Sequence, residues 1–194
     1  MVIVSGPSGA GKGTLIEGVL PRMPEVRVAV SATTRKRRPG EVDGEDYHFL
    51  TPERFEERVA RGDFLEHVEY AGNRYGTLRS EIEASLAEGR SVILEIELAG
   101  ARRVRRMVED PLSVFIAPPS IEELERRLER RATDTEAEIA RRIEVSRWEL
   151  EAAGEFDHVI VNADRDEATV ELERILRTAI RGSQQAGAPG GAGG

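Results

Sequence analysis

Residues 6–14 read GPSGAGKGT, a glycine-rich segment that carries one of only two lysines in the chain. Glycines let the backbone wrap closely around a phosphate, so that several N–H groups point at it, and a helix N-terminus and a lysine add positive charge. The apolar run VIVS precedes the segment, and apolar residues at helical spacing follow it. The sequence therefore predicts a phosphate-binding loop made of Gly6, Pro7, Ser8, Gly9, Ala10, Gly11, Lys12, Gly13 and Thr14.

One position departs from the usual pattern of such loops. Gly13 follows Lys12 where a serine or threonine is usual, so no side chain at this position can bind Mg²⁺. We expect Thr14 to assist through a phosphate or a water, and the metal to be held mainly by the nucleotide and its waters. A plain glycine-rich turn is the alternative interpretation.

The composition narrows the class of protein. The chain has 194 residues, a net charge of -8 and no cysteine, which excludes disulfides and thiolate metal sites and disfavours non-specific binding to nucleic acid. No apolar run approaches the ~20 residues that span a bilayer, and the N-terminus has no basic leader. We therefore expect a cytoplasmic protein without a membrane partner. Because all but two of the 28 basic residues are arginines, a lone arginine carries little information.

Apolar strands alternate with amphipathic helices along most of the chain. The strands are predicted at residues 2–5, 26–31, 91–97, 112–119 and 157–164. The helices that separate most of them are predicted at residues 79–88, 98–108, 121–131, 136–152 and 166–180. This alternation predicts an α/β fold, a P-loop parallel sheet core flanked by helices on both faces.

Three segments break the alternation. Residues 32–78 combine short strands, one helix at 52–61 and several turns, which indicates a small α+β lobe inserted into the core. Residues 122–148 are strongly charged and read as two helices joined by a mobile turn. The glycine-rich residues 182–194 are expected to be disordered. The remaining residues, 1–31, 79–121 and 149–181, form the core.

Six segments sharpen this interpretation. In order along the chain they are SATTRKRRPGEVDGEDYHF, FLEHVEYAGNRYGT, VILEIELAGA, FIAPPS, RLERRATDTEAEIARR and VIVNAD. Together with the loop they resemble the guanylate kinase family over roughly residues 2–180. The resemblance implies transfer of the γ-phosphoryl group from ATP to GMP, or to dGMP, with Mg²⁺ carried by ATP. It makes residues 32–78 a GMP-binding lobe and residues 122–148 a helical lid. A non-catalytic guanylate-kinase-like binding module and a related sugar-phosphate kinase are the alternatives.

The resemblance also assigns residues to the acceptor nucleotide. Arginine forks bind phosphate in a bidentate manner, and a carboxylate can accept from both N1–H and the N2 amino group of guanine. On this basis the GMP-binding residues are Ser31, Arg35, Arg38, Tyr47, Glu66, Tyr75, Thr77 and Glu97. The family usually has aspartate where Glu97 stands, so its contact with GMP is direct or through water.

A second set is implied for ATP. Lys12, Arg131 and Arg142 are the expected catalytic cations, and Arg127 is a weaker third arginine on the ATP side. Asn162 matches the loop that touches adenine. A charged helix face is the alternative for the arginines. The oligomeric state is left open.

Overall fold

The computed structural model describes residues 1–70, 72–130 and 136–186. A five-stranded sheet, ordered β2-β7-β1-β8-β9, forms its centre, and every strand pair in it is parallel. Its strands are β1 (Val2–Ser5), β2 (Val26–Val28), β7 (Ser91–Glu95), β8 (Leu112–Ala117) and β9 (His158–Val161). The predicted α/β class with a parallel core sheet is confirmed.

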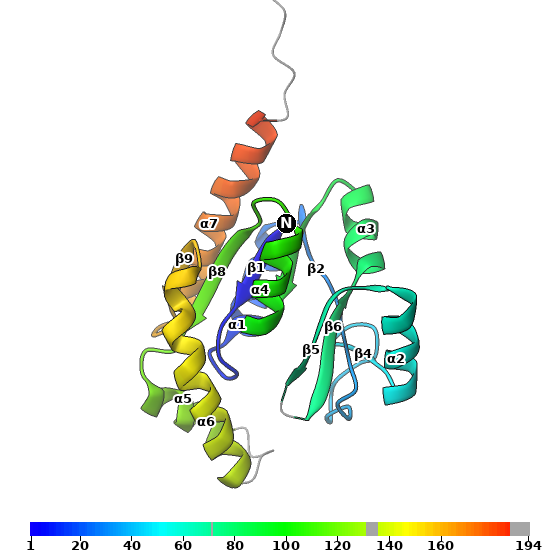
Figure 1. The fold of residues 1–194 in the computed structure, drawn as a ribbon. Coiled ribbons are helices and arrows are strands. Elements are labelled where there is room, and N and C mark those ends of the chain that lie inside the picture. Colours follow the sequence, from blue (N-terminus) through cyan, green and yellow to red (C-terminus); the bar gives the residue numbers. More distant parts are fainter. Residues whose placement is uncertain (71, 131–135, 187–194) are drawn as a thin grey trace, which may run out of the picture.

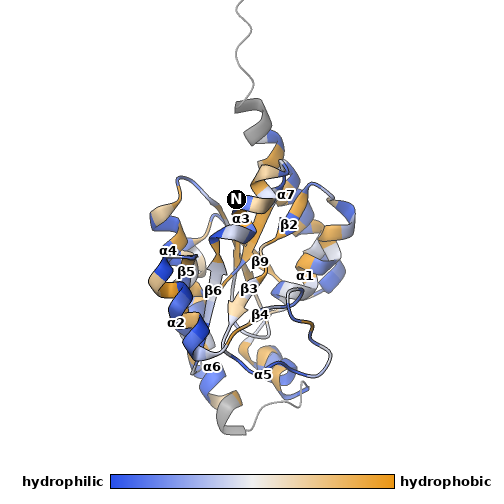
Figure 2. Cartoon of the chain, turned by 90° about the vertical axis from the view of Figure 1, so that its right-hand side faces the viewer, coloured by the Kyte–Doolittle hydropathy of each residue, from blue (hydrophilic) through white to orange (hydrophobic). Residues whose placement is uncertain are grey.

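Helices cover both faces of this sheet (Figure 1). One layer is α1 (Lys12–Val19), followed by a short 3-10 turn (Leu20–Arg22), together with α7 (Arg165–Ala186). The opposite layer includes α3 (Arg79–Ala87), α4 (Leu98–Met107) and a 3-10 turn (Ala152–Glu155). Figure 2 shows the apolar residues on the sheet and on the helix faces turned toward it, which is where burial of apolar area stabilises the fold.

A second sheet forms the inserted lobe, in the order β4-β3-β6-β5. Its strands are β3 (Ser31–Thr33), β4 (His48–Phe49), β5 (Phe64–Tyr70) and β6 (Asn73–Leu78). Helix α2 (Pro52–Arg61) packs Phe55 onto Phe64, with the two rings stacked at 4.5 Å. Thr51 caps the start of α2 by accepting from the Arg54 N–H at 3.3 Å, and Gly62 ends it at a φ of 74°.

The chain enters the lobe earlier than the sequence predicts. The strand predicted at 26–31 ends at Val28, and Ser31 begins β3 of the lobe sheet. The Ala29 N–H still donates to Ile93 of the core sheet, whereas the next N–H, of Val30, donates to the Glu81 carboxylate. Ala29 therefore makes the last backbone hydrogen bond of this segment to the core sheet, and the Glu81 carboxylate accepts from the N–H that follows it.

Helices α5 (Ile121–Arg130) and α6 (Glu136–Glu151) form the arm that the sequence assigns to the lid. They pack together through Leu124, Leu128 and Ile143. At the other end of the chain, α7 continues to Ala186, beyond the predicted helix end at Ile180 and into the segment expected to be disordered; residues 187–194 lie outside the described part. No helix among the described residues is long and apolar enough to cross a membrane.

Candidate functional site

A cleft of about 770 Å³ opens between the phosphate loop, the lobe and α6. The carboxyl end of β7 forms its floor, as expected for a ligand site in a parallel α/β sheet. Figure 1 shows the lobe and the α5–α6 arm on opposite sides of the core. The cleft therefore joins the loop predicted from the sequence to the lobe assigned to the acceptor.

The phosphate loop has the backbone that its glycines predict. Gly6, Gly9 and Gly11 have φ values of 141°, 92° and 96°, which residues with a Cβ rarely adopt. A Cβ at Gly6 would lie 2.1 Å from the Ile116 carbonyl oxygen. The loop leads directly into α1, and Lys12, only 8% exposed, donates from Nζ to Gly6 O at 2.6 Å and Pro7 O at 3.1 Å. The lysine is therefore held over the loop that it is expected to serve.

The position of the missing loop hydroxyl is faced by a carboxylate. A Cβ built on Gly13 would lie 3.5 Å from Glu95 Oε2, and Glu95 lines the cleft at the end of β7. A carboxylate here can accept a hydrogen bond from a metal-bound water. The residues present therefore fit an Mg²⁺ ion that arrives with ATP and keeps its waters.

The predicted phosphate clamp of the lobe is assembled around Glu41. Arg35 donates to both carboxylate oxygens of Glu41, at 2.7 and 3.0 Å, and the backbone N–H of Arg38 donates to the same carboxylate at 2.7 Å. The Arg35 guanidinium also lies over the Tyr47 ring, 5.3 Å from its centroid. Tyr47 in turn meets Tyr75 edge-to-face at 6.2 Å, so four of the predicted residues converge on one wall of the cleft.

The predicted guanine-reading residues also lie together. Glu66 Oε1 accepts from the backbone N–H of Thr77 at 3.1 Å and from its hydroxyl at 2.9 Å. Ser31 stands opposite Thr77 in the β3–β6 register and lines the cleft, as Glu66 does. Burial raises the pKa of Glu66, and the two bonds from Thr77 oppose this. A Cβ at Gly100 would lie 2.7 Å from Glu66 Oε2, so a side chain there would displace this carboxylate from its present position.

The ATP-side residues divide into two groups. Arg142 on α6 lines the cleft and donates to the Ser8 hydroxyl at 3.4 Å. Arg127 donates to Asn162 O at 3.0 Å and to Ala10 O at 3.4 Å, and Asn162 Nδ2 donates to Ala10 O at 2.8 Å. These two side chains therefore brace the phosphate loop from behind. Arg131 lies outside the described residues.

Several cleft residues escape the sequence analysis. Glu41, Tyr70 and Arg141 all line the cleft, and Glu149 lies buried on α6 behind it. Glu41 follows Arg35 by six positions in an irregular segment, and this spacing has no periodic meaning. Arg141 and Glu149 sit in a helix in which charged residues are common, so nothing in the sequence sets them apart.

The similarity to known proteins extends over most of the chain. The family model described as guanylate kinase matches residues 1–179. A guanylate kinase of Nostoc sp. is 51% identical over 176 residues, which cover 91% of this chain and 88% of that protein. A guanylate kinase of Rubrobacter xylanophilus is 50% identical over 182 residues, covering 94% and 95% of the two chains.

A solved structure agrees with these matches. The crystal structure of guanylate kinase from Anaplasma phagocytophilum superposes with a TM-score of 0.76 at 34% identity, covering 92% of this chain and 85% of that one. The sequence matches and the shared fold extend over the core, the lobe and the α5–α6 arm alike. The chain belongs to the guanylate kinase family.

Proposed function

We propose that the protein is a guanylate kinase that transfers the γ-phosphoryl group of ATP to the phosphate of GMP and releases ADP and GDP. The observation that supports this proposal is that two elements expected to bind phosphate line the same cleft. The glycine loop with Lys12 lies on one side, and the Arg35, Tyr47 and Tyr75 wall lies on the other. Phosphoryl transfer needs an acceptor phosphate held in line with a donor phosphate, and this arrangement provides both places.

The residues act by position and charge. The acceptor oxygen of GMP is already ionised, so no general base is needed. When ATP binds, the Lys12 ammonium exchanges its bonds to the two loop carbonyls for bonds to the donor phosphates. Together with Arg142 it neutralises the charge that spreads over the transferring group. Mg²⁺, when bound with ATP, supplies further charge neutralisation. Arg35 and Arg38 hold the GMP phosphate, with the hydroxyls of Tyr47 and Tyr75 as additional donors.

Base selection rests on the lobe. Glu66 is 2% exposed, and the two bonds from Thr77 fix its orientation, so its remaining acceptor capacity is available to the donors of guanine. Adenine offers an acceptor at N1, which a carboxylate repels. Ser31 adds a hydroxyl on the same wall, and Glu97 contacts GMP directly or through water.

Closure completes the site. The lobe and the lid are expected to move together over the two nucleotides and to exclude water, which would otherwise accept the phosphoryl group. Acceptance of dGMP, the catalytic role of Arg131 and contact of Asn162 with adenine are further parts of the proposal. The cytoplasmic location and the absence of nucleic-acid or membrane partners remain predictions from the sequence.

The proposal is tested by measuring ADP release from ATP and Mg²⁺ with each nucleoside monophosphate in turn. GMP should support turnover with a kcat/KM at least 100-fold above that of AMP, because a site built to bond one base leaves buried groups unpaired with another. Equal rates with several acceptors, or no turnover with any, would overturn it.

A further inference from the structure

Five buried side-chain oxygen atoms have no hydrogen-bond partner within the described part of the chain: Ser5 Oγ, Glu66 Oε2, Tyr70 Oη, Glu97 Oε2 and Glu149 Oε2. Glu66 belongs to the base-reading group described above, and the last three form a separate group. Tyr70 belongs to β5 of the lobe, Glu97 immediately precedes α4 of the core, and Glu149 lies on α6 of the arm. Each of the three parts that enclose the cleft therefore contributes one member of this second group.

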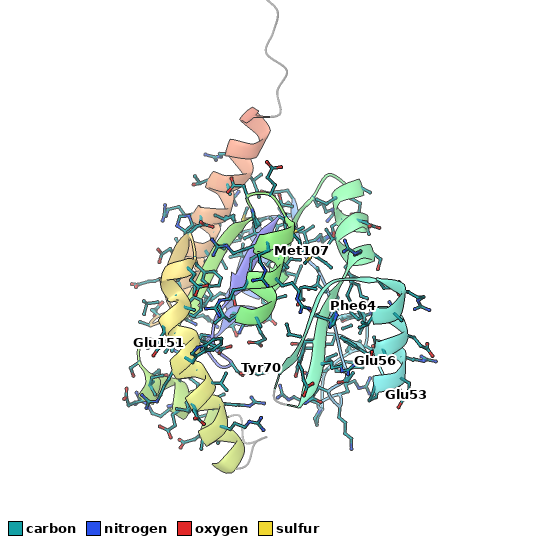
Figure 3. The ribbon with its side chains drawn as sticks, viewed as in Figure 1. Glu53, Glu56, Phe64, Tyr70, Met107 and Glu151 are labelled. Carbon is teal, nitrogen blue, oxygen red and sulfur yellow. The ribbon has the colours of Figure 1, made fainter. Side chains whose placement is uncertain are left out.

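The three groups lie within electrostatic reach of one another. Tyr70 and Glu97 line the cleft together with Arg142 and Val145 of α6, and Glu149 follows one further turn along the same face of that helix. Figure 3 places Tyr70 at the end of β5, on the side of the lobe turned toward α6. After burial, the charges of Glu97 and Glu149 are among those that raise the pKa of the Tyr70 hydroxyl, and Glu97 also raises that of Glu149.

A buried carboxylate without a partner is costly, so the ionisation of Glu149 matters. The side chain is only 2% exposed. Burial first, and then the charge of Glu97, raise the pKa of Glu149 to about 8, while Lys12 opposes the change. At neutral pH the group is therefore a carboxylic acid whose O–H can donate. Tyr70 also keeps its proton, since its pKa is raised by burial.

We propose that Tyr70 and Glu149 are positioning residues that donate hydrogen bonds to the Glu97 carboxylate when the lobe and α6 close on GMP. The proposal rests on the proposed function. Two O–H donors and one unpaired carboxylate oxygen complement each other, and bonds to an ionised acceptor are the stronger kind. The network orients Glu97 toward the acceptor nucleotide and ties the lobe, the core and the arm together only in the closed state.

A pH dependence follows from this assignment. The charged and titratable groups that face Glu149 are Lys12 from α1, Glu97 at the start of α4, Tyr70 from β5 and, on its own helix, Arg142. As the pH rises through about 8, Glu149 loses the proton that it donates and adds a negative charge beside Glu97. Affinity for GMP should therefore fall above this pH, by about tenfold at pH 9 for linkage to one proton.

The experiment is calorimetric titration of GMP in the presence of a non-hydrolysable ATP analogue, between pH 6.5 and 9.5. Tyr70→Phe and Glu149→Ala should each raise the Kd for GMP by about tenfold at pH 7, since each loses a bond to a charged group. Glu149→Gln keeps an N–H donor, so it should bind GMP more tightly than Glu149→Ala and show a flat profile above pH 8. The affinity of the Tyr70→Phe protein for GMP should still decrease above pH 8, as in the wild type.

The matched control is Glu151→Gln, because Glu151 is exposed on the same helix and points away from the cleft in Figure 3. It should retain both the affinity and the pH profile of the wild type. A Glu149→Gln profile that still falls above pH 8, or a Tyr70→Phe protein that binds GMP as the wild type does, would overturn the proposal. Thermal unfolding of each variant checks that it is folded, and the Tyr70→Phe arm stands even if the buried Glu149 variants do not fold. A wild-type protein that neither binds nor phosphorylates GMP would instead refute the proposed function.

Discussion

The Glu41 carboxylate accepts hydrogen bonds from the Arg35 guanidinium through both of its oxygens, at 2.7 and 3.0 Å. Tyr47 of the same lobe lies beneath that guanidinium. The Arg35 and Glu41 side chains are among the less exposed ion-paired groups of the described chain, at 13% and 18%. A planar guanidinium held by two hydrogen bonds cannot rotate freely, so its remaining N–H groups point in a fixed direction. We infer that Glu41 orients Arg35 for the GMP phosphate.

Removing the charge of Glu41 should loosen that orientation. Glu41→Gln is expected to raise the KM for GMP by about tenfold, with a smaller change in kcat, because a bidentate charged pair is replaced by weaker neutral bonds. Steady-state kinetics at varied GMP would measure it. Glu45→Gln, an exposed change in the same segment, is the control, and an unchanged KM in the Glu41 variant would contradict the assignment.

The same pair should make stability depend on acid. Burial alone would raise the pKa of Glu41, but hydrogen bonds from Arg35 and the Arg38 N–H outweigh it, and the pKa in the folded protein lies below the ordinary value. The stabilisation is therefore present above about pH 4.3 and is lost as the pH falls through the lower folded pKa. Thermal midpoints measured between pH 3 and 7 should fall more steeply for the wild type than for Glu41→Gln. If the thermal midpoints of the two proteins fall in parallel as the pH is lowered, the Arg35–Glu41 pair contributes no pH-dependent stability.

Lys12→Ala should nearly abolish turnover and leave the protein folded. Loss of one preorganised charge at a developing anion costs on the order of 100–1,000-fold in kcat. The two loop carbonyls that Nζ satisfies, on Gly6 and Pro7, become free to bond water, so only a small drop in thermal midpoint is expected. A coupled ADP assay and circular dichroism together decide the matter. Near-normal turnover in a folded variant would refute the role given to the loop.

Glu66→Gln should change the choice of base. The amide places an N–H₂ group among guanine donors or against Thr77, and the negative charge is lost, so kcat/KM for GMP should fall about 10- to 100-fold. The value for AMP should fall less, because adenine can match an amide, and the KM for ATP should stay nearly constant. Glu57→Gln, exposed on α2 of the same lobe, serves as control. Full retention of GMP selectivity would leave base recognition to Ser31 and Thr77.

Asn162→Ala should separate bracing from nucleotide contact. The side chain is 6% exposed and donates to Ala10 O at 2.8 Å, so its removal leaves a buried loop carbonyl without that donor. Because Arg127 still donates to this carbonyl, a loss of about 0.5–1.5 kcal/mol of unfolding free energy is expected, or roughly 2–4 °C in thermal midpoint for each kcal/mol. Differential scanning calorimetry without nucleotide reports this directly. A midpoint identical to that of the wild type would mean that the brace adds nothing, and a raised KM for ATP would then favour contact with adenine.

The sequence predicts the core well for physical reasons that individual elements illustrate. Strand β8 is apolar apart from Ser113 because both of its faces are covered, and α5 has apolar residues only at Ile121, Leu124 and Leu128, at helical spacing. The glycine loop needs positive φ at Gly6, Gly9 and Gly11, and no other residue satisfies this as cheaply. Each of these features can therefore be predicted from the residue types and their spacing within one short segment.

The clamp and the braces have no such local signature. Glu41 matters because a loop folds it back onto Arg35, and Asn162 matters because β9 ends beside a loop 152 residues away in sequence. The crossing after β2 is joined by Glu81 of α3, whose carboxylate accepts from the Val30 N–H 51 residues away in sequence. Spacing along one chain, without the tertiary contacts, does not distinguish these residues from the many other charged and polar ones.

The lobe is reached by only two crossings, one near Val30 and one near Leu78, and Glu81 of α3 contacts both the first crossing and His48 of the lobe, at 3.4 and 2.9 Å. The residues proposed to read the acceptor base, Ser31, Glu66 and Thr77, therefore all lie in one uninterrupted stretch that is shorter than the core. In evolutionary terms this is a cassette: recombination with two breakpoints could retarget the acceptor in one step while the ATP-handling machinery is inherited intact. The constraint on such an exchange is the joint at Glu81, which an incoming lobe has to match.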